Sequence, residues 1–127
     1  MLKSSVYYIL HIMTNFGPYI KQKREQLGGK SNSLRKVAED VNIEPSYLSK
    51  IERGLVAPPG EEAITRIAHR LNLDKDITLA VAGKISSDLH EAITRRPELF
   101  ARLIRAVVNQ PEDKMVKIVE EIKDGEW

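Results

Sequence analysis

The hydrophobic residues of this chain recur mainly at the spacing of α-helices. The clearest apolar stripe has residues at positions i, i+3, i+4 and i+7, namely Ile64, Ile67, Ala68 and Leu71. From Tyr19 onward no segment shows the alternation of apolar and polar residues that is typical of a half-buried strand. The pattern therefore predicts an all-α protein.

Start and stop signals predict four other helices in the first two thirds of the chain. Gly28 and Gly29 would end the first of them, and Ser33 would cap the second. Pro45 suits the first turn of the third helix, which Gly54 would close. These helices are expected over residues 17–27, 34–41, 45–53 and 75–82, with the striped helix between the last two.

Three more helices are expected in the C-terminal third, over residues 87–95, 97–108 and 111–123. Pro97 and Pro111 each stand where a proline at the first helical position is tolerated. The second and third of these helices have wide apolar faces, but a segment of about 40 residues does not easily form an independent core. This C-terminal tail is therefore expected to pack on the N-terminal helical domain, to dimerise, or to bind a partner.

The segment Val6–Met13 is apolar but far shorter than a membrane span, and it lacks the cleavage pattern of a signal peptide. It is expected to be a short strand that pairs between subunits, or a leader from an over-long gene model, since Met13 stands just before a good helical pattern. The predicted organisation is thus a leader or strand over residues 1–15, a helical domain over 16–84, and a helical tail over 85–127.

Composition narrows the class of protein. Hydrophobic residues make up 42% and charged residues 30% of the 127 residues, which is typical of a globular protein. The chain has no cysteine, so it has neither a disulfide nor a thiolate metal site, and we expect it in the cytoplasm. Residues 1–60 carry nine Lys and Arg against five Asp and Glu, whereas residues 61–127 carry eleven against thirteen. A basic front half indicates an anionic partner at that end.

Residues 34–53 have the dimensions of a helix-turn-helix. Val37 and Ala38 would face inward on its first helix, and Leu48 and Ile51 would fix its second helix to the core. The opposite face of the second helix would then present short polar and basic side chains, as entry into the major groove of DNA requires. These outward residues are Pro45, Ser46, Tyr47, Ser49, Lys50 and Arg53.

Residues 16–75 resemble the helix-turn-helix domains of the xenobiotic-response-element/Cro-type family of bacterial and phage repressors. The resemblance rests on the string Ser46-Tyr47-Leu48-Ser49-Lys50-Ile51-Glu52-Arg53-Gly54, on Ala38 and Pro58, and on Ile67-Ala68-His69-Arg70-Leu71. It implies a five-helix lambda-repressor-like DNA-binding domain, here followed by a three-helix C-terminal extension.

The resemblance also implies roles for single residues. Pro45, Ser46, Tyr47 and Lys50 occupy positions that approach base edges in similar proteins, and Lys50 could donate to a guanine. Arg53 would contact a phosphate, as would two residues of the preceding helix, Arg35 and Lys36.

Four departures from the family pattern weaken the contacts expected from one monomer, one being that the loop Leu55-Val56-Ala57 lacks the basic residues often found there. Leu34 stands where the family usually has a glutamine that braces the contact to the DNA backbone, and Glu44 replaces the usual Ser or Thr cap. The turn over residues 28–32 is about three residues longer than usual. We therefore expect this protein to bind DNA as a dimer.

Glu52 lies among apolar positions of the second helix, where an unpaired carboxylate would be costly. Arg24 on the first helix is its natural partner, and the family resemblance indicates the same pair. We expect a structural salt bridge between Arg24 and Glu52, with neither residue reading a base.

Nothing in the sequence indicates an enzyme. Gly29-Lys30-Ser31 resembles the end of a phosphate-binding loop, but Arg24 stands where that motif requires a glycine. The three histidines are far apart, there is no cysteine nucleophile, and no serine lies in a nucleophile elbow. We expect no catalytic residue, no metal and no cofactor.

The sequence thus predicts a transcriptional repressor that binds double-stranded DNA at a palindromic operator as a homodimer, with no membrane association. The alternative is an antitoxin, or a regulatory partner of a toxin or of an ImmA/IrrE-type metalloprotease. In that case the helical tail would bind the partner, and Trp127 could anchor it. The plainer interpretation of Trp127, which we favour, is that it folds back on the dimer.

Overall fold

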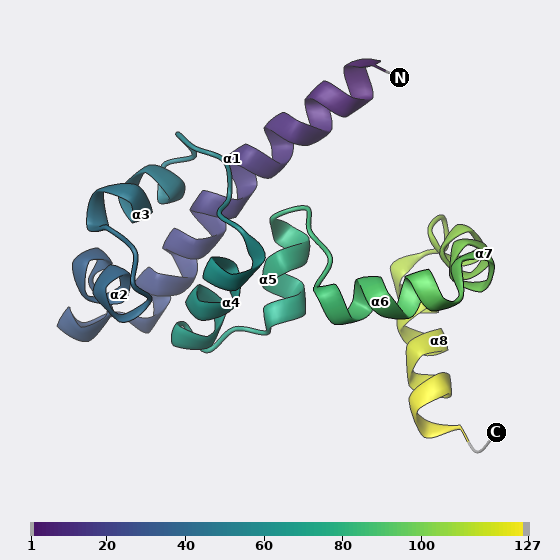
Figure 1. The fold of residues 1–127 in the computed structure, drawn as a ribbon. Coiled ribbons are helices and arrows are strands. Elements are labelled where there is room, and N and C mark those ends of the chain that lie inside the picture. The colour runs from purple at the N-terminus through teal and green to yellow at the C-terminus, as the bar shows by residue number, and fades with distance from the viewer. Residues whose placement is uncertain (1, 126–127) are drawn as a thin grey trace. The chain divides into compact units, whose positions relative to one another are not determined.

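The computed structural model describes the backbone of residues 2–125 and the side chains of residues 15–125 (Figure 1). Trp127, the anchor considered for a partner or for contact with the dimer itself, lies outside the described residues. The described part of the chain is all-helical, as the sequence predicts, and no helix in it is long and apolar enough to cross a membrane. Its elements are α1 (Leu2–Leu27), the 3-10 helix η1 (Lys30–Asn32), α2 (Leu34–Asp40), α3 (Pro45–Glu52), α4 (Glu61–Arg70), α5 (Lys75–Val81), α6 (Ser87–Arg95), α7 (Pro97–Val107) and α8 (Glu112–Asp124).

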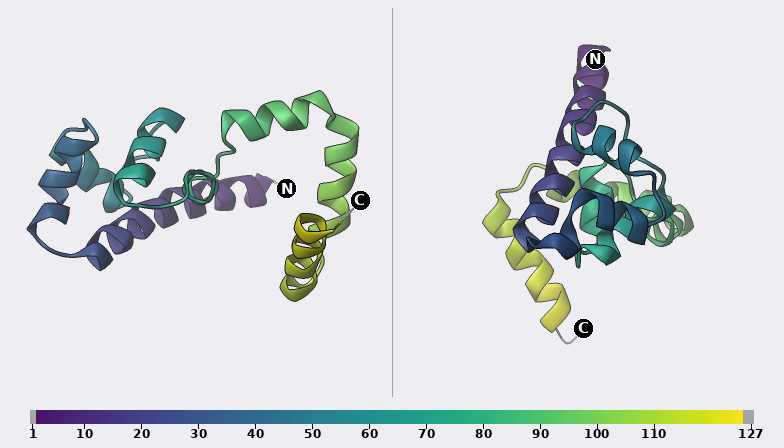
Figure 2. Two further views of the ribbon diagram at one scale, coloured as in Figure 1. Left: turned by 90° about the horizontal axis from the view of Figure 1, so that it is seen from below. Right: turned by 90° about the vertical axis from the view of Figure 1, so that its left-hand side faces the viewer.

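The first helix is longer than the sequence analysis expects. It begins at Leu2, so the segment Val6–Met13 is helical and the expectation of a short strand there is wrong. Apolar residues at 6, 9, 10 and 13 have helical spacing, and the same stripe continues into Phe16 and Ile20. Pro18 lies inside this helix, although it cannot donate a backbone hydrogen bond. In two further views, the N-terminal end of α1 projects beyond the other helices of its unit (Figure 2).

The helices form two separate compact units, which divide between Ser86 and Ser87. The first unit, made by α1 to α5, contains all the buried hydrophobic residues of the described chain. Its core consists of Phe16, Ile20, Val37, Ala38, Val41, Leu48, Ile51, Ile64, Ile67, Ala68, Leu71, Leu79 and Ala82. The predicted stripe of α4 lies entirely in this core, which explains why α4 packs on both α2 and α5.

The two tight turns that connect α2 to α3 and α4 to α5 have the same backbone geometry. Asn42 and Asn72 each have a φ of 59°, in the left-handed region that Asn tolerates better than most residues. The amide of Ile43 then donates to Ala38 at 2.9 Å, and the amide of Leu73 donates to Ala68 at 2.8 Å. These bonds satisfy carbonyl groups at the ends of α2 and α4.

The second unit consists of α6, α7 and α8. The helix bounds agree with the predicted ones to within about a residue, except that Pro111 caps α8 from outside instead of occupying its first turn. None of residues 87–125 is buried. Their large aliphatic side chains, such as Leu99, Ile104 and Val119, remain about half exposed.

Candidate nucleic-acid interface

Helix α2 and the turn after it hold α3 at a fixed crossing. Ser33 caps α2, since its side chain accepts a hydrogen bond from the amide of Lys36 at 3.2 Å. Val37 and Ala38 are fully buried, and the small side chain of Ala38 allows α3 to approach closely. Ile43 in the turn packs against the same core.

Helix α3 is buried along one face and exposed along the other. Leu48, Ile51 and Glu52 are buried, at the spacing that a helix anchored by one stripe requires. The predicted outward residues lie on the opposite side, where Ser46, Tyr47, Lys50 and Arg53 are exposed and Pro45 and Ser49 are half-buried. Tyr47 keeps 39% of its surface accessible, a large exposure for an aromatic residue. The side chain of Arg53 bends back along the helix, and its Nε donates to the Ser49 carbonyl at 3.3 Å.

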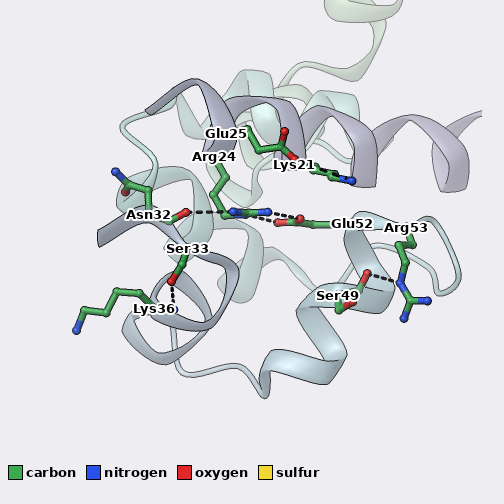
Figure 3. Close-up of polar contacts among 9 residues, drawn as sticks. All are labelled: Lys21, Arg24, Glu25, Asn32, Ser33, Lys36, Ser49, Glu52 and Arg53. Carbon is green, nitrogen blue, oxygen red and sulfur yellow. Dashed lines mark hydrogen bonds and ion pairs between the residues drawn. The ribbon is translucent and has the colours of Figure 1, made fainter. Parts of the chain in front are cut away.

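Arg24 and Glu52 form a two-pronged ion pair that joins α1 to α3 (Figure 3). Arg24 Nε donates to Glu52 Oε2 at 2.8 Å, and Arg24 Nη2 donates to Glu52 Oε1 at 2.9 Å. The remaining Nη1 donates to the carbonyl of Asn32 at 3.1 Å, so the same guanidinium also holds η1. These hydrogen bonds to Glu52 raise the pKa of Arg24, so it stays charged at any ordinary pH. The pair is thus a structural brace behind α3.

Gly17 allows the backbones of α1 and α3 to meet. A Cβ atom at this position would stand 2.0 Å from the carbonyl oxygen of Ile51 and 2.8 Å from that of Glu52. Neither backbone oxygen can move without shifting the end of α3. The position therefore requires glycine for its small size.

The two basic residues predicted on α2 differ in their surroundings. Arg35 and Lys36 are both exposed near the N-terminal end of the helix. Lys36 Nζ lies 3.3 Å from Asp40 Oδ1, one turn further along, so part of its charge is offset. Leu34, at the position where the resemblance led us to expect glutamine, packs against the core. Glu44 caps α3 by position only, with no hydrogen bond from its side chain.

One cluster of polar contacts, which is centred on Arg70, was not predicted from the sequence. Arg70 on α4 donates to Asp40 Oδ2 at 2.9 Å, to Asn32 Oδ1 at 2.9 Å and to the Ser31 carbonyl at 2.6 Å. Asn32 in turn donates from Nδ2 to the carbonyl of Gly28 at 2.8 Å. The long turn before α2 is therefore pinned by two arginines, Arg24 and Arg70. No local signal could reveal this, because Arg70 lies 38 residues from Asn32 in the sequence.

The arrangement is a helix-turn-helix whose second helix is anchored to the core of the first unit by one face and has polar and basic side chains on the other. A family model described as helix-turn-helix matches residues 20–86, just over half of the chain. The chain belongs to this family, in its xenobiotic-response-element/Cro type. No curated protein and no solved structure matches the chain. The family makes this protein a DNA-binding transcription regulator.

The family is one of DNA-binding regulators and not of enzymes. Within the described residues, no group of three or more His, Asp or Glu side chains is arranged to hold a metal ion.

Proposed function

We propose that this protein is a transcriptional repressor that binds a palindromic operator as a homodimer. The observation that carries the proposal is the division of α3 into two faces. Leu48, Ile51 and the braced Glu52 fix one face to the core, and the other face presents Ser46, Tyr47 and Lys50 to solvent. A helix held in this way fits the major groove with its polar face toward the bases.

Each exposed residue has a role that suits its chemistry. Lys50 donates to guanine N7 or O6, and Tyr47 contacts a thymine methyl group or a phosphate. Pro45, Ser46 and Ser49 lie on the same face of α3 and come close to the bases with it. Arg53, Arg35 and Lys36 contact phosphates on either side, which sets the register of α3 without reading sequence.

Two copies of the chain are needed for tight binding. Glu44 places a negative charge near the phosphates, and Lys36 is partly neutralised by Asp40, so one copy offers few unopposed cations. Two copies related by a two-fold axis would insert their α3 helices into major grooves about 34 Å apart. Occupancy of the operator then blocks transcription, with no chemical step.

The second unit is the proposed source of the dimer contact. Its helices bury no residue of their own, and large aliphatic side chains on α6, α7 and α8 are about half exposed. Exposed apolar surface of this extent is typical of a site where another apolar surface binds.

The proposal is tested by measuring binding of the protein to its own upstream DNA across a salt series, with scrambled DNA as competitor. We expect competitor-resistant binding that weakens steeply with salt, because Lys and Arg displace counterions from the phosphates. Lys50→Ala and Tyr47→Ala should each lose specific binding while the fold is retained. Lys84→Ala removes an exposed lysine that follows α5 and lies outside both α3 and the second unit, and it serves as the control. Unchanged binding in the two α3 variants would refute the assignment of α3.

A second candidate function is that of an antitoxin or regulatory partner, acting through the tail. It is favoured by the same exposed apolar faces of α6 to α8, which a toxin or a metalloprotease could cover in place of a second copy. Sedimentation of the full-length protein separates the two. A dimer supports the repressor, and a folded monomer that does not bind DNA supports the partner role.

A further inference from the structure

Arg70 holds both ends of α2 with a single guanidinium group. Two of its nitrogens donate to Ser31 and Asn32, which precede the helix, and its Nε donates to Asp40, the last residue of the helix. The planar fork of arginine makes this possible, since its N–H groups point in different directions at fixed angles. The side chain of Arg70 is 24% exposed and that of Asp40 is 32% exposed, and of the three hydrogen bonds only the one to Asn32 is partly buried.

Helix α2 depends on such external contacts. It has only seven residues, and a helix of that length is unstable by itself. Its N-terminal flank is an unusually long turn, which would be free to move if nothing held it. Ser33 caps the first turn, but the position of the turn before it depends on the contacts from Arg24 and Arg70.

Arg70 also controls the charge at the α2 surface. Asp40 is shared between Arg70, at 2.9 Å, and Lys36, at 3.3 Å. Both interactions lower the pKa of Asp40, and the hydrogen bond from Arg70 is the larger cause. Without Arg70, Lys36 would be the cation left beside the Asp40 carboxylate. The carboxylate would then hold Lys36 more strongly and keep it away from a phosphate.

We propose that Arg70 is a positioning residue for DNA binding, which holds the phosphate-contacting end of α2 in place and offsets part of the Asp40 charge that Lys36 faces. This inference rests on the proposed function, since it concerns the same DNA-facing surface. Arg70 itself lies on α4 and acts through Ser31, Asn32 and Asp40.

The chain offers two informative comparisons. Arg70→Gln removes the fork and its charge, whereas Arg70→Lys keeps a positive charge near Asp40 but cannot form all three hydrogen bonds. Arg66→Gln is the matched control. Arg66 lies one turn earlier on α4 and its Nε donates to the Val41 carbonyl at 3.0 Å, so this variant loses one charge and one contact to the C-terminal end of α2.

The experiment measures operator affinity of the full-length variants across a salt series, after circular dichroism has shown that each one is folded. We expect Arg70→Gln and Arg70→Lys each to lose on the order of tenfold in affinity, and the salt slope of Arg70→Gln to fall by roughly one phosphate contact. Arg66→Gln should change affinity by less than about threefold.

Hydrogen exchange in the absence of DNA gives an independent readout. The amides of Lys36 and Val37, in the first turns of α2, should exchange faster in both Arg70 variants than in Arg66→Gln. Faster exchange together with weaker binding supports the proposal.

Two results would overturn it. If Arg70→Lys binds as the wild type does, a charge at this position suffices and the fork positions nothing. If Arg70→Gln and Arg66→Gln weaken binding equally, the loss reflects net charge alone. Failure of the proposed function is a different result, because the wild-type protein itself would then bind no specific DNA.

Discussion

Among residues 15–125, Glu52 is the one buried charged residue, and its neighbours determine what it does. A carboxylate in this position is stable because Arg24 satisfies both of its oxygens. The pair lies on the buried side of α3, away from the face proposed to contact DNA, so we expect its effect on DNA binding to be indirect. The ion pair of Arg24 with Glu52 is therefore one of the contacts that hold α3 in position.

We expect Glu52→Gln to lower the free energy of unfolding by about 3 kcal/mol, because it leaves the Arg24 charge without its partner in a partly buried site. Urea denaturation measures the change. The control is Glu25→Gln on the same helix as Arg24. Glu25 pairs with Lys21 at 3.9 Å, and both side chains are more than half exposed, so its loss should cost less than about 0.5 kcal/mol. Equal losses in the two variants would contradict a special role for the buried pair.

The carboxyl of Asp40 makes stability depend on pH. Its pKa is lowered, chiefly by the hydrogen bond from Arg70, and so the folded state favours the charged form. The resulting stability is complete above the unfolded pKa of about 3.9 and is lost as the pH falls through the lower folded value.

We therefore expect Asp40→Asn to be less stable than the wild type at pH 7, and the difference to shrink as the pH falls below about 4. Urea denaturation over a pH series measures it. As a control, Glu91→Gln removes an exposed pair with Arg95 and should show little difference at any pH. A difference for Asp40→Asn that stays constant from pH 7 to pH 3 would contradict this account.

At the scale of helices, the crossing of α1 over α3 is a main contact that sets the position of α3, the helix proposed to enter DNA. Gly17 brings the two backbones together, and Phe16 and Ile20 bury apolar surface beside it. The ion pair of Arg24 with Glu52 lies further along the same helix. The orientation of α3 is thus fixed by α1 as much as by the turn that precedes α3.

Gly17→Ala should displace α3 and lower both stability and operator affinity, since the new Cβ would overlap the Ile51 carbonyl oxygen. We expect a loss of roughly 1–3 kcal/mol in the free energy of unfolding. Thermal denaturation and DNA titration measure the two effects. Gly60→Ser is the control, because a Cβ at Gly60 meets nothing within 4 Å and serine suits the N-cap of α4. A stable Gly17→Ala protein with normal DNA binding would show that the crossing can relax.

At the scale of the whole molecule, the two units differ in how completely they bury their apolar residues. The first has a continuous core, which reaches Ala82 near its C-terminal end. The second has none among residues 87–125. This difference predicts that the first unit folds alone and that the second depends on association.

A chain that ends at Ser86 should therefore remain folded and become monomeric. Its operator affinity should fall by a factor on the order of 100 or more, because two linked recognition helices gain from effective concentration and a single one does not. Sedimentation equilibrium and DNA titration check the two expectations. Persistent dimers of the shortened chain would move the interface to the first unit, where the projecting end of α1 is available (Figure 2).

The sequence by itself determined most of the helices and the residues exposed on α3. Ser33 and Pro45 act on the chain within three or four residues, and the apolar stripes of α3 and α4 repeat within one or two turns. All the residues that give such a signal lie close together in the sequence, so the local sequence is enough to predict the helix. The family motif has the same local character, which is why the helix-turn-helix could be identified from residues 46–54 and their neighbours.

Only the tertiary structure decided how these helices are braced. The first helix extends back to Leu2, and its glycine at position 17 meets the backbone of α3. Arg70 reaches Ser31 and Asn32 across 39 and 38 residues of chain. An arginine on an exposed helix face has the same local sequence whether water or another helix accepts its hydrogen bonds. Its partners are fixed only when the core brings α4 against α2, and that packing is a property of the whole unit.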